Sequence, residues 1–265
     1  MNTAVITGGT RGIGAGLVAC FLRSGWNVAY SGTTDMTIEK SLQKLSGEFR
    51  KETYAAFKCD VTQEQDLKNL WESAFKAFGR IDIWVNNAGI AYEQAPFHQV
   101  PPGIVMKIID TNVRGLMLAT HIAYNLMLQQ GFGAIYNMEG LGSDGRRIPG
   151  LTPYGTSKRA VRYFTDAFAR EIRKGPVIVG TLMPGMVLTD LILEPVRKDP
   201  VKNKDTIWIY NILASDTSTV TPFLVRKMIS NRKNGVKISF FTTWKAIWRF
   251  IYAPVKRRDV VSKYL

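Results

Sequence analysis

Tyr154 and Lys158 are the two residues whose types and spacing best suit proton transfer. They lie four positions apart in the run Tyr154-Gly155-Thr156-Ser157-Lys158, so a helix would place both on one face. An ammonium beside a phenol stabilises the phenolate and lowers its pKa from about 10 towards neutrality. We therefore predict that Tyr154 donates or accepts a proton near neutral pH. The same spacing is also typical of an ordinary surface pair, so the surrounding motifs must decide.

A glycine-rich loop near the N-terminus predicts a site for the phosphates of a dinucleotide. The run from Thr7 to Gly14, TGGTRGIG, follows an apolar strand and opens a helical stretch. Glycines there permit a tight bend, a close approach of pyrophosphate and close packing of helix on strand. The helix start offers free N–H groups to the phosphates. A glycine-rich turn without a ligand is the alternative. The residues expected to contact the cofactor are Gly8, Thr10, Arg11, Gly12, Ile13 and Gly14.

The end of the second predicted strand favours NADP over NAD. Dinucleotide folds often place an acidic residue there to hold the ribose 2′-hydroxyl, but this strand ends in Ser-Gly-Thr-Thr. Arg11 is available to a 2′-phosphate, and Ser31 and Thr33 offer it hydroxyl donors. Asp35 follows closely, and a different turn would bring it to the ribose and favour NAD. We expect NADP as the cofactor.

These motifs lie within alternating strands and helices. Short apolar runs predict strands at 3–7, 27–31, 54–58, 81–85, 133–138 and 176–182. Apolar positions at helical spacing predict helices that include 12–24, 63–78, 103–130 and 155–173. Such alternation implies right-handed crossovers and a parallel sheet covered on both faces. We predict a single-domain α/β fold of the Rossmann type, with a doubly wound parallel sheet, an irregular C-terminal lid and a basic helical tail.

Over residues 3–190 the sequence resembles the short-chain dehydrogenase/reductase family. The motifs that carry the resemblance are the glycine loop, Cys59-Asp60-Val61, Asn86-Asn87-Ala88-Gly89, Thr111-Asn112-Val113, the Tyr154/Lys158 pair and Pro184-Gly185-Met186-Val187-Leu188-Thr189. Their order along the chain makes a chance assembly negligible. The resemblance implies an oxidoreductase that transfers hydride between a nicotinamide cofactor and a carbonyl or alcohol.

For the adenosine half of the cofactor, the resemblance implies two contact segments. Asp60 and Val61 would hold the adenine, and Asn87, Ala88 and Gly89 would pass along the ribose. Each polar residue also has a structural interpretation. Asp60 would cap the helix that begins near residue 63, and Asn87 would close a turn after its strand.

For the nicotinamide half, the resemblance implies that Val187 and Thr189 hold the carboxamide, with Pro184 and Gly185 beside the cofactor. A helix N-cap is the alternative role for Thr189.

The resemblance also implies a proton relay. Lys158 would bind the cofactor as well, and Asn112, at a helix irregularity, would order water near Lys158. A solvent-facing polar residue in mid-helix is the alternative role for Asn112.

The serine of the family is displaced here. Relatives have a catalytic Ser about 13 positions before the Tyr, where this chain has Leu141. Ser143 lies 11 positions before Tyr154, and two flanking glycines would supply a bulge that brings it into place. We expect Ser143 to donate a hydrogen bond to the substrate's carbonyl oxygen. Otherwise it is a loop residue and Tyr154 alone holds that oxygen. Glu139 is a rival polar group, but its carboxylate would repel a developing oxyanion.

Two runs resemble the chlorophyll(ide) b reductases, one branch of the family. They are 137–143, NMEGLGS, and 184–191, PGMVLTDL; Glu139 replaces the branch's Asp, and the region between Asp144 and Pro153 diverges. The branch implies NADPH-dependent reduction of the 7-formyl group of a chlorin. Alternatives are a 3-oxoacyl carrier-protein reductase, a general alcohol dehydrogenase, or an NADP-sensing scaffold protein without turnover.

The composition is that of an ordinary globular protein with an unusual basic end. Of 265 residues, 46% are hydrophobic and 21% charged, and the net charge is +14. Residues 197–265 hold 15 basic and 4 acidic residues, which argues against a general nucleic-acid binder. We expect a core at 1–190, a substrate lid at 191–243 and a basic amphipathic tail at 244–265, all in one domain.

The tail combines aromatic and basic residues. Its apolar stripe is Trp244, Ile247, Trp248, Ile251 and Tyr252, and its cations are Lys245, Arg249, Lys256, Arg257 and Arg258. Such a stripe suits a membrane surface, and docking on the core or on a partner subunit is the favoured alternative. No nucleic-acid recognition motif accompanies it.

Cysteine and histidine usage predicts no metal site and no disulfide framework. The two cysteines, Cys20 and Cys59, are too few for a disulfide framework or a cysteine-based zinc site. The two histidines, His98 and His121, do not have the spacing of metal ligands. No apolar run reaches the roughly 18 residues of a membrane span. The chain starts almost directly with a strand, so we expect a cytoplasmic protein, or one in the plastid stroma or at a membrane surface if a transit peptide was removed. The expected partners are a small carbonyl substrate and, from the resemblance, further copies in a homodimer or homotetramer.

Overall fold

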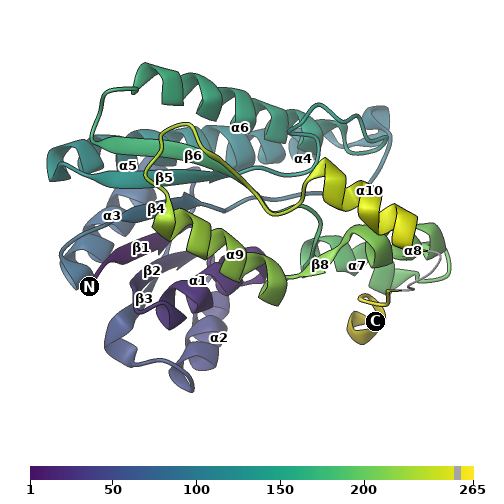
Figure 1. Cartoon of the computed structure of the whole chain (residues 1–265), viewed down its shortest axis with the longest axis horizontal. Coiled ribbons are helices and arrows are strands. Elements are labelled where there is room, and N and C mark those ends of the chain that lie inside the picture. Colours follow the sequence, from purple (N-terminus) through teal and green to yellow (C-terminus); the bar gives the residue numbers. More distant parts are fainter. Residues whose placement is uncertain (254–257) are drawn as a thin grey trace.

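A seven-stranded parallel sheet forms the centre of the computed structural model, which describes residues 1–253 and 258–265 (Figure 1). Its strand order is β3-β2-β1-β4-β5-β6-β9. The strands are β1 (Thr3–Ile6), β2 (Asn27–Gly32), β3 (Tyr54–Lys58), β4 (Ile83–Asn86), β5 (Gly133–Met138), β6 (Val177–Met183) and β9 (Lys237–Ser239). The order reverses between β1 and β4, where folds of this type bind ligands at the carboxyl ends of the strands.

Helices cover both faces of the sheet. On one face α1 (Gly12–Arg23) and α9 (Thr217–Ser230) pack through a core that includes Leu17, Phe21 and Leu224. The other face is covered by α3 (Glu64–Phe78) and α5 (Leu116–Gln130), with α6 (Thr152–Glu171) beside them. The predicted doubly wound Rossmann-type sheet and its six predicted strands are therefore confirmed.

The predicted helix over 103–130 is present but interrupted. It consists of α4 (Pro102–Ile109), a π-helical turn η3 (Asp110–Gly115) and α5. The irregularity expected at Asn112 is therefore confirmed. π-Helical turns inside α-helices are frequent at functional sites. One helix that the sequence patterns did not mark, α2 (Asp35–Ser46), follows β2.

Part of the segment expected as a lid, 191–243, lies in the core. The seventh strand β9 pairs in parallel with β6, and α9 packs on α1 so closely that a Cβ at Gly16 would lie 2.8 Å from Thr221. A three-residue strand is too short to give an alternating pattern, and Pro222 within α9 obscures the helical one. Outside the main sheet remain α7 (Asp190–Lys198), α8 (Lys204–Leu213) and the small pair β7 (Val187–Leu188) and β8 (Ser215–Asp216).

The C-terminal segment is a short helix followed by a packed irregular end. The helix α10 (Thr243–Tyr252) lies beside α8 at one end of the molecule (Figure 1). Beyond it, Val261 is fully buried and Arg258 donates hydrogen bonds to the carbonyls of Ile212 and Ala214. Of the tail cations named above, Lys256 and Arg257 lie outside the described residues.

Candidate active site

The glycine loop adopts the conformation that its sequence requires. Gly8 and Gly12 have φ of +65° and +57°, a region that favours glycine. A Cβ at Gly14 would overlap the carbonyl oxygen of Gly8 and lie 2.6 Å from Nδ2 of Asn87. The loop therefore leads into the N-terminus of α1, which no side chain of its N-cap residue Arg11 caps, and this fits the phosphates of a dinucleotide.

Asn87 ties this loop to the end of β4. Its Nδ2 donates to the carbonyl oxygens of Thr7, at 2.9 Å, and Gly8, at 3.0 Å. Its neighbour Ala88 touches the loop, since a Cβ at Gly8 would lie 3.0 Å from the Cα of Ala88. Asn87 thus has a structural role, but in holding the glycine loop rather than in closing a local turn, and Ala88 lies beside the same loop.

Of the residues expected near a 2′-phosphate, one is buried and supports the glycine loop, and the others are exposed. Ser31 is buried, and its hydroxyl accepts a hydrogen bond from the Gly8 N–H at 3.3 Å, so it supports the loop. Arg11 and Thr33 are exposed. Asp35, the residue that would favour NAD, forms an ion pair with Lys58 at 2.9 Å. That ion pair directs Asp35 towards β3.

Asp60 and Val61 follow β3 at the same edge of the sheet. The exposed Asp60 carboxylate accepts hydrogen bonds from the backbone N–H and the hydroxyl of Thr62. This local turn precedes α3, whose N-cap Gln63 makes no side-chain cap, so the interpretation of Asp60 as the cap of that helix is wrong. Val61 is buried, and a Cβ at Gly115 would lie 2.9 Å from its carbonyl oxygen. Val61 thus packs against the π-helical turn.

Asn112 is a fully buried anchor, so the solvent-facing alternative is wrong. Its Oδ1 accepts from the Ile90 N–H at 2.8 Å, and its Nδ2 donates to the Ile90 carbonyl at 2.9 Å and to the Ser157 hydroxyl at 3.1 Å. A Cβ at Gly89 would lie 3.3 Å from Oδ1 of Asn112 and 3.5 Å from Nζ of Lys158. Three motifs that are remote in sequence therefore meet at one point.

Lys158 and Tyr154 lie together on α6. The buried Lys158 ammonium donates to the Met138 carbonyl at the end of β5, at 3.1 Å, and lies 5.8 Å from the centre of the Tyr154 ring. Burial lowers the pKa of Lys158 to about 8, against the opposing charge of Glu139.

Burial also raises the pKa of Tyr154, to about 12. The prediction that Lys158 lowers this pKa towards neutrality is therefore wrong, because desolvation outweighs the neighbouring ammonium. At neutral pH the phenol keeps its proton, which suits an acid rather than a base.

The serine expected at the substrate oxygen makes a different contact. Ser143 is fully buried, and its hydroxyl donates to Oε2 of Glu139 at 2.7 Å. The backbone nearest the Tyr154 hydroxyl belongs to Gly140, where a Cβ would lie 2.5 Å from that oxygen. The bulge therefore turns Ser143 towards Glu139. The sequence named Glu139 only as a rival polar group and missed this pairing.

The Pro-Gly-Met-Val-Leu-Thr run returns the chain to the glycine loop. Gly185, after the buried Pro184, has a φ of +78°, and Val187 is buried in β7. Thr189 then lies against Gly12, since a Cβ at Gly12 would lie 3.3 Å from its Cγ2. Although Thr189 precedes α7, its hydroxyl caps no N–H of that helix within the described chain. The run therefore lies directly beside the glycine loop.

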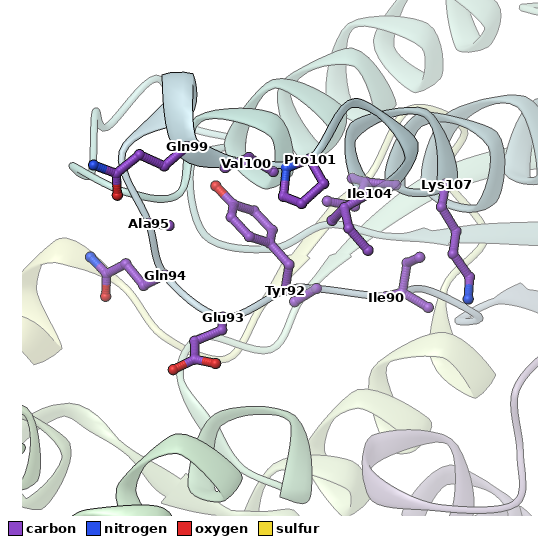
Figure 2. A pocket seen from close by; sticks show the side chains of 12 residues that line it. Ile90, Tyr92, Glu93, Gln94, Ala95, Gln99, Val100, Pro101, Ile104 and Lys107 are labelled. Carbon is purple, nitrogen blue, oxygen red and sulfur yellow. The ribbon is translucent and has the colours of Figure 1, made fainter.

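A pocket of about 600 Å³ opens beside this centre, between residues 90–95 and α4 (Figure 2). Tyr92 and Ile104 are among its apolar walls, and Glu93 and Lys107 lie at opposite ends. Ile90 connects the pocket to the centre, because Asn112 binds its backbone. In the same segment, the Tyr92 hydroxyl donates to the Gly150 carbonyl at 2.6 Å and fixes this side of the pocket. The sequence analysis missed these residues, although they directly follow the Asn-Asn-Ala-Gly motif.

The described residues also bear on metal binding and membrane insertion. Among residues 1–253 and 258–265, no cluster of His, Cys, Asp and Glu has the composition and proximity to hold a metal ion. Over the same residues, no helix is both long enough and apolar enough to cross a membrane. Cys20 and Cys59 are both free and buried.

Comparison with known proteins identifies the family. A family model described as short chain dehydrogenase matches residues 2–199, three quarters of the chain. The chain belongs to the short-chain dehydrogenase family. It is therefore an oxidoreductase by family, in agreement with the motifs that the structure brings together.

Within this short-chain dehydrogenase family, the chain is similar to plant chlorophyll(ide) b reductases. It is 36% identical to the chlorophyll(ide) b reductase NOL, chloroplastic, of Arabidopsis thaliana over 83% of this chain and 63% of that protein. It is also 36% identical to the protein of the same name from Oryza sativa subsp. japonica, over 92% and 73% of the two chains. The predicted resemblance to this branch is confirmed, and the chain spans just under two thirds of the Arabidopsis relative.

Solved structures share the fold of this short-chain dehydrogenase. The structure titled ElxO with NADP bound has a TM-score of 0.79 at 24% identity, covering 90% of this chain and 96% of that one. A 3-ketoacyl-(acyl-carrier-protein) reductase from Brucella melitensis, complexed with NADH, has a TM-score of 0.78 at 26% identity with the same coverage.

Proposed function

We propose that the chain is an NADPH-dependent reductase that delivers hydride to the carbonyl of a bulky apolar substrate, with the 7-formyl group of chlorophyll(ide) b as the first candidate. One observation carries the proposal. The Tyr154/Lys158 pair and the buried Asn112 meet at the carboxyl end of the sheet, and Ile90 links them directly to an apolar pocket. A carbonyl substrate in that pocket would lie against the segment that Asn112 holds.

The chain's own residues would supply binding and proton transfer. When bound, the nicotinamide cofactor supplies the hydride. Tyr154 would hold the carbonyl oxygen and give it a proton, since its raised pKa keeps the phenol protonated at neutral pH. Lys158 would stabilise the resulting phenolate, and Asn112 would position the segment through which water returns the proton. Because the Ser143 hydroxyl donates to Glu139, we place Ser143 in a supporting role and leave Tyr154 to hold the oxygen.

The cofactor side of the site supports NADPH over NADH. Arg11 and Thr33 are exposed beside the loop, while Asp35 is engaged by Lys58. The glycine loop, Asp60 and Val61, the segment 87–89 and the run from Pro184 to Thr189 would bind the remaining length of the dinucleotide.

The substrate assignment rests on the relatives and the pocket together. The plant relatives are named for a large, largely apolar chlorin substrate, and the pocket here has mostly apolar walls and a volume of about 600 Å³. A 3-oxoacyl carrier-protein reductase, a general alcohol dehydrogenase and a scaffold protein without turnover remain as outcomes of the test.

The test begins with NADPH and NADH titrations of the purified chain and continues with a substrate panel. The panel contains a chlorin with a 7-formyl group, simple bulky aldehydes and 3-oxoacyl thioesters, and oxidation of NADPH is followed by absorbance. Reduction of the chlorin to its hydroxymethyl product supports the proposal. Preference for the thioesters or for simple alcohols selects a rival enzyme, and NADPH binding without turnover selects the scaffold protein.

The proposals on membrane contact, compartment and oligomeric state start from the exposed surface of α10 and from the relatives. The stripe on α10 is open rather than docked on the core: Trp244, Trp248 and Ile251 are 72%, 53% and 58% exposed. Aromatic side chains beside a basic surface suit an anionic membrane, so we propose membrane-surface contact through this helix. The plastid relatives support the plastid stroma or its membrane surface over the cytoplasm, and the family resemblance supports a homodimer or homotetramer.

A further inference from the structure

We propose that Glu139 is a positioning residue whose buried carboxylate is the counter-charge that keeps Lys158 an ammonium beside Tyr154, with Ser143 serving this carboxylate rather than the substrate. The inference rests on the proposed function, because it assigns a role within the same proton-transfer centre. Nothing in the family motifs assigns a role to an acid at this position, where the chain differs from its branch by one methylene group.

The first support is the burial of Glu139. Its side chain has no exposed surface, although it directly follows β5 and its backbone N–H donates to the Leu182 carbonyl on β6 at 2.9 Å. Burying a carboxylate costs several kcal/mol unless opposite charge and hydrogen bonds compensate. A buried acid at the end of a core strand therefore needs cationic neighbours.

The second support is that the Glu139 carboxylate is only partly paired. Oε2 accepts the Ser143 hydroxyl at 2.7 Å and lies 3.7 Å from Nζ of Lys237 on β9. Oε1 is buried and has no hydrogen-bond partner among the described residues. Neither the one hydroxyl nor the long contact to a partly exposed lysine satisfies the carboxylate. Its charge is thus left to act on other groups nearby.

The third support is the position of Lys158. Its ammonium donates to the carbonyl of Met138, the residue that precedes Glu139. Glu139 is the charged group that opposes the effect of burial on the pKa of Lys158. The titratable and charged groups near this centre include Tyr154, Lys158 and Arg159 from α6, Lys237 from β9 and Glu139 itself, and Arg159 donates to the Ser143 carbonyl at 3.0 Å. Glu139 is the carboxylate among these groups, and without it the buried Lys158 would face a phenol and further cations.

The role of Ser143 follows from the same geometry. A serine hydroxyl has one proton, and here it is donated to an anionic acceptor, which makes a stronger bond than a neutral one. While Glu139 is ionised, Ser143 has no proton left for a substrate oxygen. The bulge formed by the two glycines therefore serves the carboxylate.

The test compares Glu139→Gln with the parent chain and measures Lys158 directly. Each protein is labelled with trace acetic anhydride across the pH range, and acetylation of Lys158 is read by mass spectrometry. We expect the midpoint of Lys158 reactivity to move to lower pH by about one unit or more, the size typical of losing one close opposite charge. Native circular dichroism and retained NADPH binding show that the variant is folded.

Two control variants separate the charge of Glu139 from other effects. Asp144→Asn removes an exposed acid of the same loop and should leave the midpoint unchanged. Lys237→Gln removes the competing cation and should move the midpoint to higher pH. If Glu139→Gln does not fold, this Lys237 shift decides the matter.

An unchanged Lys158 midpoint in folded Glu139→Gln would overturn the proposal, and so would an unchanged or lower midpoint in Lys237→Gln. Because labelling needs no substrate, this outcome is distinct from a failure of the proposed function. A chain that reduces no carbonyl but shows the expected shifts keeps the role of Glu139 and loses only the reaction.

Discussion

The amide of Asn112 donates to the hydroxyl of Ser157 at 3.1 Å, and this hydroxyl donates in turn to the carbonyl oxygen of Tyr154 at 2.7 Å. The π-helical turn is thereby connected to the first turn of α6. The same amide also holds both backbone polar groups of Ile90. One buried side chain thus fixes the proton donor on one side and the wall of the pocket on the other.

Asn112→Ala should therefore impair both stability and turnover. It leaves two partly buried backbone groups of Ile90 without this partner, and the unfolding free energy should fall by about 1–2 kcal/mol. The turnover number should fall at least about 10-fold, because Tyr154 and the pocket wall lose their common support. Urea unfolding and steady-state kinetics measure the two effects. Asn125→Ala is the matched control, since its amide contacts only His121 on the exposed side of α5; equal losses in both variants would contradict the assignment.

Tyr154→Phe should abolish most turnover while leaving cofactor binding nearly intact. Loss of a general acid typically costs about 10²–10⁴ in rate, whereas the hydroxyl makes no contact that shapes the glycine loop. Substrate reduction and NADPH fluorescence titration give the two readouts. Tyr163→Phe, on the same helix with 77% of its residue surface exposed, should behave as the parent protein. If Tyr154→Phe keeps the parent's activity, Tyr154 is not the proton donor.

Much of this centre was predictable from the sequence, and the reasons are physical. Gly8, Gly12 and Gly14 occur where backbone geometry admits few other residues, and the Tyr154/Lys158 spacing is set by one helical turn. The hydrogen bonds of Asn112 and Ser143 depend instead on which loops meet in space, so the motifs indicated the helix irregularity at Asn112 but not the contact of Ser143 with Glu139. Similarly, β9 joins the sheet through β6, a contact that its three residues do not encode as a pattern.

The pKa of Lys158 predicts an unusual dependence of stability on pH. Its folded pKa of about 8 lies below the value of about 10.4 for an unfolded lysine. Below pH 8 the native state must hold a buried ammonium, which costs stability, and the cost disappears as pH rises from about 8 to about 10.4. The parent should therefore gain stability relative to Lys158→Met as pH rises from about 8 to about 10, because the variant has no ammonium there to lose its proton.

Thermal unfolding across this pH range tests the prediction. Lys76→Met removes an exposed lysine of α3 and should show no such trend. A parent that gains no stability relative to Lys158→Met over this range would contradict the lowered pKa of Lys158.

Arg11→Ala should weaken NADPH binding about 10-fold and leave NADH binding nearly unchanged. The reason is that a charge-assisted hydrogen bond to the 2′-phosphate contributes about 1.5–3 kcal/mol, and NADH lacks this group. Titrations with both nucleotides measure the ratio. Arg23→Ala is the control, because it removes the same charge from the far end of α1, where Arg23 is paired with Glu48. It should change the affinity for neither nucleotide. Equal weakening of NADPH and NADH by Arg11→Ala would defeat the 2′-phosphate assignment.

The exposed stripe on α10 should bind anionic lipid. Trp248 and Tyr252 stack at 5.4 Å between ring centres on a face open to solvent, and the segment from residue 197 onwards carries the chain's excess of cations. In co-sedimentation, the protein should bind vesicles that contain phosphatidylglycerol and bind neutral vesicles weakly.

The double change Trp248→Ser and Ile251→Ser should reduce vesicle binding about 10-fold or more, because burying each large apolar side chain contributes about 1.5–3 kcal/mol. Phe75→Ser, an exposed apolar residue on α3, is the control and should bind as the parent does. If the double variant binds vesicles normally but changes its oligomeric state by light scattering, the stripe serves contact between subunits and the membrane assignment falls.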